Sequence, residues 1–162
     1  MFERTDMRGA VTIELTDASG ALVHREQRNN RIVLAGRRHV AGMFAGVTPP
    51  PTKVTHVGVG TGATAPDDDQ TKLVAERAGR SPITQVAYAD VIEGVAPTAV
   101  KRTRVSLTAV FDFAQANDPN VPLREAALFT AAADGVMYNR VVLDPVVKTN
   151  AFKLTVLWDI VF

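Results

Sequence analysis

The stretch that decides the fold is Phe152-Lys153-Leu154-Thr155-Val156-Leu157-Trp158-Asp159-Ile160-Val161-Phe162. Large apolar side chains occupy every second position from Phe152 to Phe162, and Trp158 is one of them. Lys153, Thr155 and Asp159 fall on the other side. A period of two is typical of a β-strand with one buried face. A strand with so much apolar area would invite aggregation at a sheet edge, so we expect it to lie inside a sheet.

Similar patterns indicate further strands upstream. Residues 10–16 alternate in the same way, and a turn-forming run at 17–20 separates them from a second apolar run at 21–24. This combination predicts an N-terminal β-hairpin extension over residues 1–28. Further strands are expected within 54–59, 83–95, 105–113, 126–132 and 136–143. Asp134-Gly135, between the last two, is a strong hairpin signal.

One helix is expected near residues 31–45. Asn29-Asn30 offers an N-cap, and the apolar residues that follow lie mostly on one helical face. Gly46 and the prolines at 49–51 would end the helix. The sum predicts a mainly β (α+β) fold, an antiparallel β-sandwich of about seven strands with one helix near residues 31–45. The sandwich and helix would form a domain of residues 29–162.

Composition excludes several classes of protein. The chain has 162 residues and no Cys, which rules out disulfides, cysteine zinc ligands and thiol catalysis. Its net charge of +1 gives no electrostatic reason to expect nucleic acid or a membrane as a partner. No apolar run approaches the roughly 20 residues that span a bilayer. Residues 1–6 are charged and lack an apolar signal core, so we expect the protein to stay in the cytoplasm unless an assembly carries it out.

Two segments invite a ligand-binding interpretation that their spacing does not support. Gly58, Gly60 and Gly62 form G-x-G-x-G, whereas a dinucleotide site needs G-x-G-x-x-G at the start of a helix. A glycine-rich turn beside a packed strand is therefore expected. The acidic run at 67–69 lacks the alternating ligands of a calcium loop and is expected to be a solvated acidic loop, capping the short element that follows.

Catalytic constellations are also missing from the sequence. His24, His39 and His56 have no metal-ligand spacing, and no G-x-S-x-G elbow occurs. Glu93 and Asp112 could be named as an acid–base pair, but two acidic residues in a chain of this size indicate little without their geometry. We therefore predict that the protein is not an enzyme, that it has no catalytic, cofactor-binding or metal-binding residues, and that it uses no cofactor.

Two charged groups are expected to serve structure. Arg31, Arg37 and Arg38 form a modest basic patch on the expected helix, which favours a solvated face or a salt-bridged protein contact over nucleic acid. Arg124 and Glu125 precede an apolar run, and such a pair at the edge of a buried strand predicts an internal ion pair between them.

Four segments together resemble small structural proteins of tailed phages and phage-tail-like particles, the β-domain family found in tail, baseplate and tail-fibre regions. The segments are 55–66 (THVGVGTGATAP), 69–76 (DQTKLVAE), 123–129 (LREAALF) and 148–162 (KTNAFKLTVLWDIVF). They are similar to that family's glycine-rich V-G-T-G-x-x-A-P segment, its D-T-x-L-x-x-E stretch, its R-E-A-G-L-F segment and its L-T-V-x-W-x-I-x-F ending. Ala127 stands where the pattern has Gly, a departure that affects only local backbone freedom.

The resemblance covers about residues 29–162 and implies a virion building block without catalysis. It implies a tail, baseplate or tail-fibre-attachment protein that assembles in the host cytoplasm with copies of itself and neighbouring virion proteins, as a homo-oligomer. Alternatives are a capsid decoration or head–tail connecting protein, or a host-surface carbohydrate-binding module. The carbohydrate-binding alternative would need exposed aromatic side chains, and the chain has one Trp and two Tyr.

Overall fold

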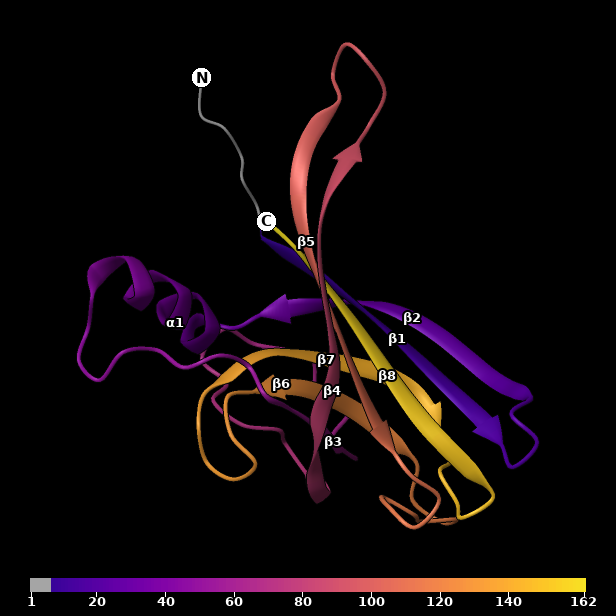
Figure 1. Ribbon diagram of the computed structural model, residues 1–162. Helices are drawn as coiled ribbons and strands as arrows, with labels where there is room; N and C mark the ends of the chain where they lie inside the picture. The colour runs from indigo at the N-terminus through magenta and orange to yellow at the C-terminus, as the bar shows by residue number, and fades with distance from the viewer. Residues whose placement is uncertain (1–6) are drawn as a thin grey trace.

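A computed structural model describes residues 7–162, so residues 1–6 and the expectation based on their charges lie outside the described part. Eight strands and one helix make up this part, as the ribbon in Figure 1 shows. They are β1 (Arg8–Asp17), β2 (Leu22–Ile32), α1 (Leu34–Ala45), β3 (His56–Gly60), β4 (Glu76–Glu93), β5 (Val100–Phe111), β6 (Leu123–Phe129), β7 (Met137–Val146) and β8 (Phe152–Val161). The expectation of a mainly β protein with one helix is confirmed.

The strands of residues 7–162 form a closed antiparallel barrel in the order β1-β2-β7-β6-β3-β4-β5-β8, so the expected seven-strand sandwich is wrong. Alternation in the sequence shows which face of a strand is buried, but not which strands are its neighbours. Two short contacts close the barrel. β3 joins β4 to β6, and β2 meets β7 only at Arg31↔Arg140 and Ile32↔Asn139. The N-terminal hairpin supplies β1 and β2 to this barrel, while a domain boundary near residue 28 remains a prediction.

β8 lies inside the sheet as expected. It pairs with β1 along one edge and with β5 along the other, and its even-numbered side chains from Leu154 to Ile160 point into the core. Trp158 is 0% exposed, and its indole N–H donates to Asn30 Oδ1 at 2.8 Å. Burying a side chain of this size stabilises the fold by roughly 1.5–3 kcal/mol, so β8 organises the barrel interior.

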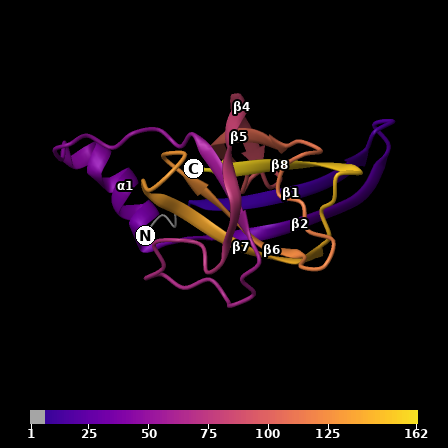
Figure 2. The same cartoon turned by 90° about the horizontal axis from the view of Figure 1, so that it is seen from below.

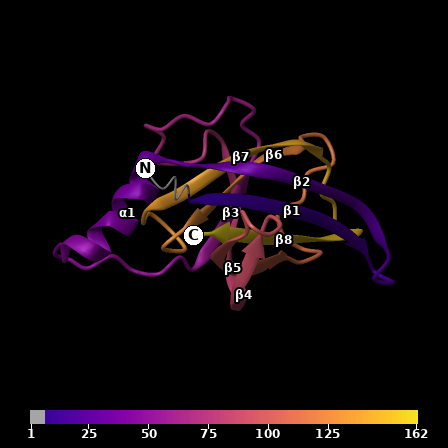
Figure 3. The same cartoon turned by 90° about the horizontal axis from the view of Figure 1, so that it is seen from above.

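The helix begins three residues later than expected. Asn29 and Asn30 belong to β2, so the expected N-cap is wrong, and Val33 takes that position without a side-chain hydrogen bond. The carbonyl oxygen of Asp68 accepts the Leu34 N–H at 2.9 Å instead. A loop distant in sequence thus replaces the local cap. The end at Gly46 is confirmed, with a left-handed φ of 61°. Figure 2 and Figure 3 show α1 at the end of the barrel away from the β1–β2 turn.

The hairpin expected around Asp134-Gly135 is confirmed. Both residues have positive φ, 52° and 69°, in the turn that joins the antiparallel strands β6 and β7. Both conformations favour the Asp-Gly pair that the sequence supplies. The turn brings β6 and β7 together at the centre of the buried polar network described next.

Candidate functional site

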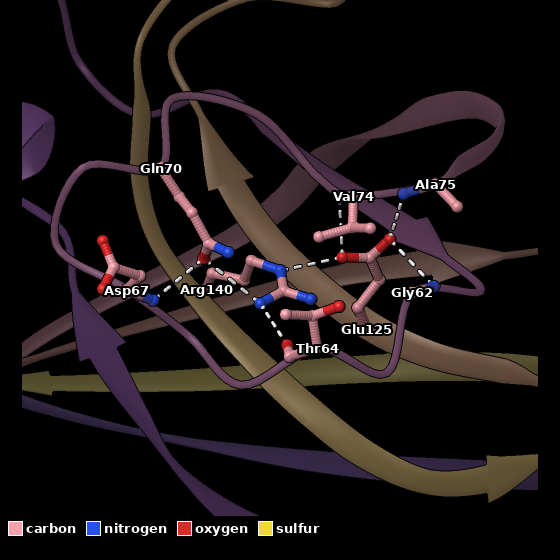
Figure 4. Close-up of polar contacts among 8 residues, drawn as sticks. All are labelled: Gly62, Thr64, Asp67, Gln70, Val74, Ala75, Glu125 and Arg140. Atoms are coloured by element: carbon pink, nitrogen blue, oxygen red, sulfur yellow. Dashed lines mark hydrogen bonds and ion pairs between the residues drawn. The ribbon is translucent and has the colours of Figure 1, made fainter.

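A buried ion pair between Glu125 on β6 and Arg140 on β7 lies at the centre of a polar network (Figure 4). Arg140 Nε donates to Glu125 Oε2 at 2.8 Å, and both side chains are 0% exposed. The expected partnership of Glu125 with Arg124 is therefore wrong. Adjacent residues of a strand point to opposite faces, so Arg124 turns away, whereas the diagonal cross-strand neighbour Arg140 shares the face of Glu125. The sequence feature that could have identified Arg140 as the partner is its position as a charged residue within the apolar run 137–143.

Glu125 holds the loop of residues 61–75 in place. Its carboxylate accepts backbone N–H groups from Gly62 at 3.1 Å, Val74 at 3.0 Å and Ala75 at 2.7 Å (Figure 4). Arg140 Nη1 donates to the Thr64 carbonyl at 2.8 Å and to Gln70 Oε1 at 3.2 Å, further along the same loop. All of these contacts join residues of the described chain, so the network stabilises the fold, while Arg140 Nη2 is buried without a hydrogen-bond partner among residues 7–162.

The glycine-rich run is explained by this network. A Cβ at Gly60 would lie 2.5 Å from Glu125 Oε1, and one at Gly62 would lie 2.7 Å from the same oxygen. Both positions therefore require a residue without a side chain. A phosphate could not occupy this place because the carboxylate already does, which agrees with the expectation of a packed glycine segment.

The acidic loop caps α1 rather than the element that follows it. Asp68 accepts from Arg31 Nε at 2.9 Å and from Arg37 Nη2 at 2.8 Å, and these guanidinium groups lower its pKa from 3.8 to about 2. The expectation that all three arginines of the basic patch lie on the helix is therefore wrong. Arg31 lies on β2, and Arg37 and Arg38 lie on α1. Within residues 7–162 no group of three or more His, Asp or Glu side chains could hold a metal ion.

The remaining candidate residues are not brought together. His24, His39 and His56 lie on β2, α1 and β3, where His39 Nε2 contacts the Thr52 carbonyl and His56 Nδ1 contacts the Thr55 hydroxyl. Glu93 is opposite Val100 at one end of the β4–β5 pair, and Asp112 follows the other end of β5. These two residues are about 40 Å apart along the strand, too far to act on one bond.

The most distinctive surface is a projecting hairpin, which we call the arm and define as residues 84–103 (Figure 1). β4 is paired with β3 only as far as Ile83, and β5 is joined to the β8 side only as far as Thr103. Beyond these points the two strands pair with each other alone. Val86, Tyr88 and Ile92, which we call the arm face, are between 66% and 75% exposed.

The arm face continues the inner side of the barrel. Val86 is opposite Leu107 and Tyr88 is opposite Val105, and both partners belong to or pack against the core. These positions therefore carry residues of the type found in the core, although they lie beyond the end of the barrel. The sequence could not show that they are exposed, because apolar residues at alternate positions, here interrupted at Asp90, are also typical of a buried strand face.

An apolar groove of about 310 Å³ lies at the base of the arm. Val40 and Met43 of α1 form one wall, and Val86, Ile160 and Phe162 lie across from them. The hydroxyl of Tyr138 also lines the groove and is buried without a hydrogen-bond partner among the described residues. Burial raises the Tyr138 pKa to about 12. The apolar groove therefore reaches from α1 to Val86, the first residue of the arm face.

No helix among residues 7–162 combines the length and the apolar character needed to cross a bilayer.

Comparison with known proteins does not identify a family for this chain. No protein-family model matches the chain, and neither a curated protein nor a solved structure does. The likeness to phage structural proteins therefore stays a prediction from its four segments.

Proposed function

We propose that this chain is a structural subunit of a tailed-phage virion or a phage-tail-like particle, at the tail, baseplate or tail-fibre attachment site. It would act without catalysis, through contacts with copies of itself and with neighbouring virion proteins. The single observation that carries the proposal is the arm, whose exposed side chains at Val86, Tyr88 and Ile92 belong to the core-facing side of β4. Contiguous exposed apolar surface of this kind is typical of sites where another protein packs.

The arrangement of the family-like segments supports the same proposal. Gly62, Val74 and Glu125 come from three different segments of the resemblance, and Glu125 accepts hydrogen bonds from both of the others. The fourth segment contains β8, the interior strand with Trp158. Residues that were matched as short separate motifs therefore cooperate in one structural unit, as expected if they are shared for a common fold.

The test is the presence and position of the chain in particles. Particles from the producing strain would be purified on a density gradient, probed by mass spectrometry and labelled with gold-conjugated antibody for electron microscopy. We expect the chain to co-sediment with particles and the label to lie on the tail or baseplate. Label on the head would favour the capsid decoration or connecting alternative, and particles that are complete without the chain would refute a virion role.

Solution behaviour gives a second measurement. Light scattering on the purified chain should show association that increases with protein concentration, because the proposal depends on subunit contacts. A matched pair of variants locates the contact. Ile92→Lys, on the arm face, should reduce association, while Val147→Lys, at an exposed valine outside the arm, should not.

A further inference from the structure

The outer edge of β4 is free over most of the arm. From Thr84 to Glu93 no other strand of residues 7–162 pairs with the side of β4 that faces away from β5. At about 3.3 Å per residue, this edge is about 33 Å long. It is an unmatched row of backbone donors and acceptors.

Proteins usually protect such edges with lysine, proline or a bulge. The segment TQVAYADVIE at 84–93 contains no Lys and no Pro, and Asp90 and Glu93 are its only charged residues. The register irregularity of the β4–β5 pair lies between Ile83 and Gln85, before the exposed part begins. The free edge is therefore long and is not protected by these devices, and one face of the segment carries Val86, Tyr88 and Ile92 with Asp90 between them. Such an edge is a template for an added strand.

We propose that the occupant of this edge is β4 of a second copy, paired antiparallel about a two-fold axis at Ala89. The inference rests on the proposed function, since it names the surface through which the subunits associate. A two-fold axis makes the interface self-complementary, so one segment can serve both copies. Two arms then form a continuous four-stranded sheet in the order β5, β4, the partner's β4 and the partner's β5.

The side chains select the register. Residues directly opposite each other in an antiparallel pair share a face, so only pairings of the same parity are allowed. With the axis at Ala89, Val86 lies opposite the partner's Ile92, and Tyr88 lies opposite the partner's Asp90. Val86 and Ile92 thus form two apolar cross-strand pairs related by the axis, and no like charges are opposed.

Neighbouring registers are worse. An axis at Asp90 would place this carboxylate opposite its own copy, which is destabilising for directly opposed like charges. An axis at Tyr88 would place Val86 opposite the partner's Asp90. Both alternatives separate Val86 from the partner's Ile92, so the distribution of charge and apolar area along β4 favours the axis at Ala89.

The absence of cysteine from the chain makes the register directly measurable. In an Ala89→Cys variant the two thiols would face each other across the axis, with Cα atoms about 4.5–5.5 Å apart, which suits a disulfide. Ala87→Cys is the matched control, because Ala87 is also exposed and lies on the same face of the same strand. Its Cα would lie about 13 Å from the partner's, beyond disulfide reach.

The experiment oxidises each full-length variant with copper phenanthroline in air and follows the dimer band by non-reducing electrophoresis. We expect Ala89→Cys to cross-link roughly ten times faster than Ala87→Cys, because only the first pair of thiols satisfies disulfide geometry. Adding Ile92→Lys to Ala89→Cys should slow cross-linking, and adding Val147→Lys should not. Both cysteines lie on an exposed hairpin, so the folded barrel is unaffected.

The outcomes separate this inference from the proposed function. Equal cross-linking at both positions would indicate random collision and overturn the register. Absence of cross-linking at Ala89 in a sample that light scattering shows to be associated would overturn arm pairing but leave the virion role intact. Efficient Ala89 cross-linking in a protein missing from particles would support the pairing and refute the virion role.

Discussion

The Glu125–Arg140 pair gives the sharpest test of how the barrel is held together. In Glu125→Gln the amide oxygen could still accept from Gly62 and Ala75, but the amide nitrogen would replace Oε2. There it would face the Val74 N–H and Arg140 Nε, both of which are donors. The guanidinium would also lose the one carboxylate that contacts it among residues 7–162. Removing one member of a buried pair costs about 3–5 kcal/mol, a large fraction of the roughly 5–15 kcal/mol that stabilises a domain.

A double-mutant cycle isolates the pairwise contribution to this loss. Glu125→Gln, Arg140→Met and the double variant would be unfolded in urea, with the free energy of unfolding taken from each transition. We expect a coupling of about 2 kcal/mol, because each single change leaves a buried polar partner that the double change removes. The matched control cycle uses Arg124→Met, whose side chain lies on the opposite face of β6 and should couple by less than ~0.5 kcal/mol.

Two results would refute the reasoning. Coupling to Arg124 as large as coupling to Arg140 would mean that the strand face is wrongly assigned. Coupling near zero for Arg140, together with a small loss in Glu125→Gln alone, would mean that water reaches the pair and solvates both charges. In either case the loop of residues 61–75 would have to be held by other contacts.

Three further predictions concern single positions. Trp158→Ala should lower the free energy of unfolding by about 3–5 kcal/mol, and an unchanged melting temperature would show that Trp158 is not in the core. Gly60→Ala should cost about 1–3 kcal/mol, because the new methyl group would meet Glu125 Oε1, whereas Gly79→Ala should be nearly neutral since nothing lies within 4 Å of its Cβ. Asp68 has a folded pKa of about 2 against an ordinary 3.8, so its stabilisation is full above about pH 4 and is lost as the pH falls toward 2. Urea transitions between those pH values should show this loss in the native chain and not in Asp68→Asn.

Local features could be predicted from the sequence because they depend on residues close together in the chain. The interior position of β8 follows from the alternation that places Trp158 on one face, and the β6–β7 turn follows from Asp134-Gly135. The end of α1 at Gly46 is local for the same reason. The start of α1 depends on Asp68, more than thirty residues away, and was therefore misplaced.

Features that depend on strand neighbours could not be predicted. Closure of the barrel needs the β2–β7 contact at Arg31↔Arg140 and the insertion of β3 between β4 and β6, and neither leaves a periodic signal. The partner of Glu125 was misassigned for the same reason. Sequence adjacency favoured Arg124, while geometry brings Arg140 across from the neighbouring strand.

The arm shows that a core-like sequence pattern can also occur on an exposed surface. Val86, Tyr88 and Ile92 share one face of β4, interrupted by Asp90, as the buried residues share one face of β8, yet β8 has partners on both edges and the arm has a partner on one. Burial is therefore decided by the availability of neighbours rather than by the strand's own residues. No strand of residues 7–162 pairs with the outer edge of β4 in the arm, so a partner strand there would have to come from another chain. On this argument the Ala89→Cys cross-link tests more than one contact, because it asks whether a second copy supplies the partner strand that β4 lacks in the single chain.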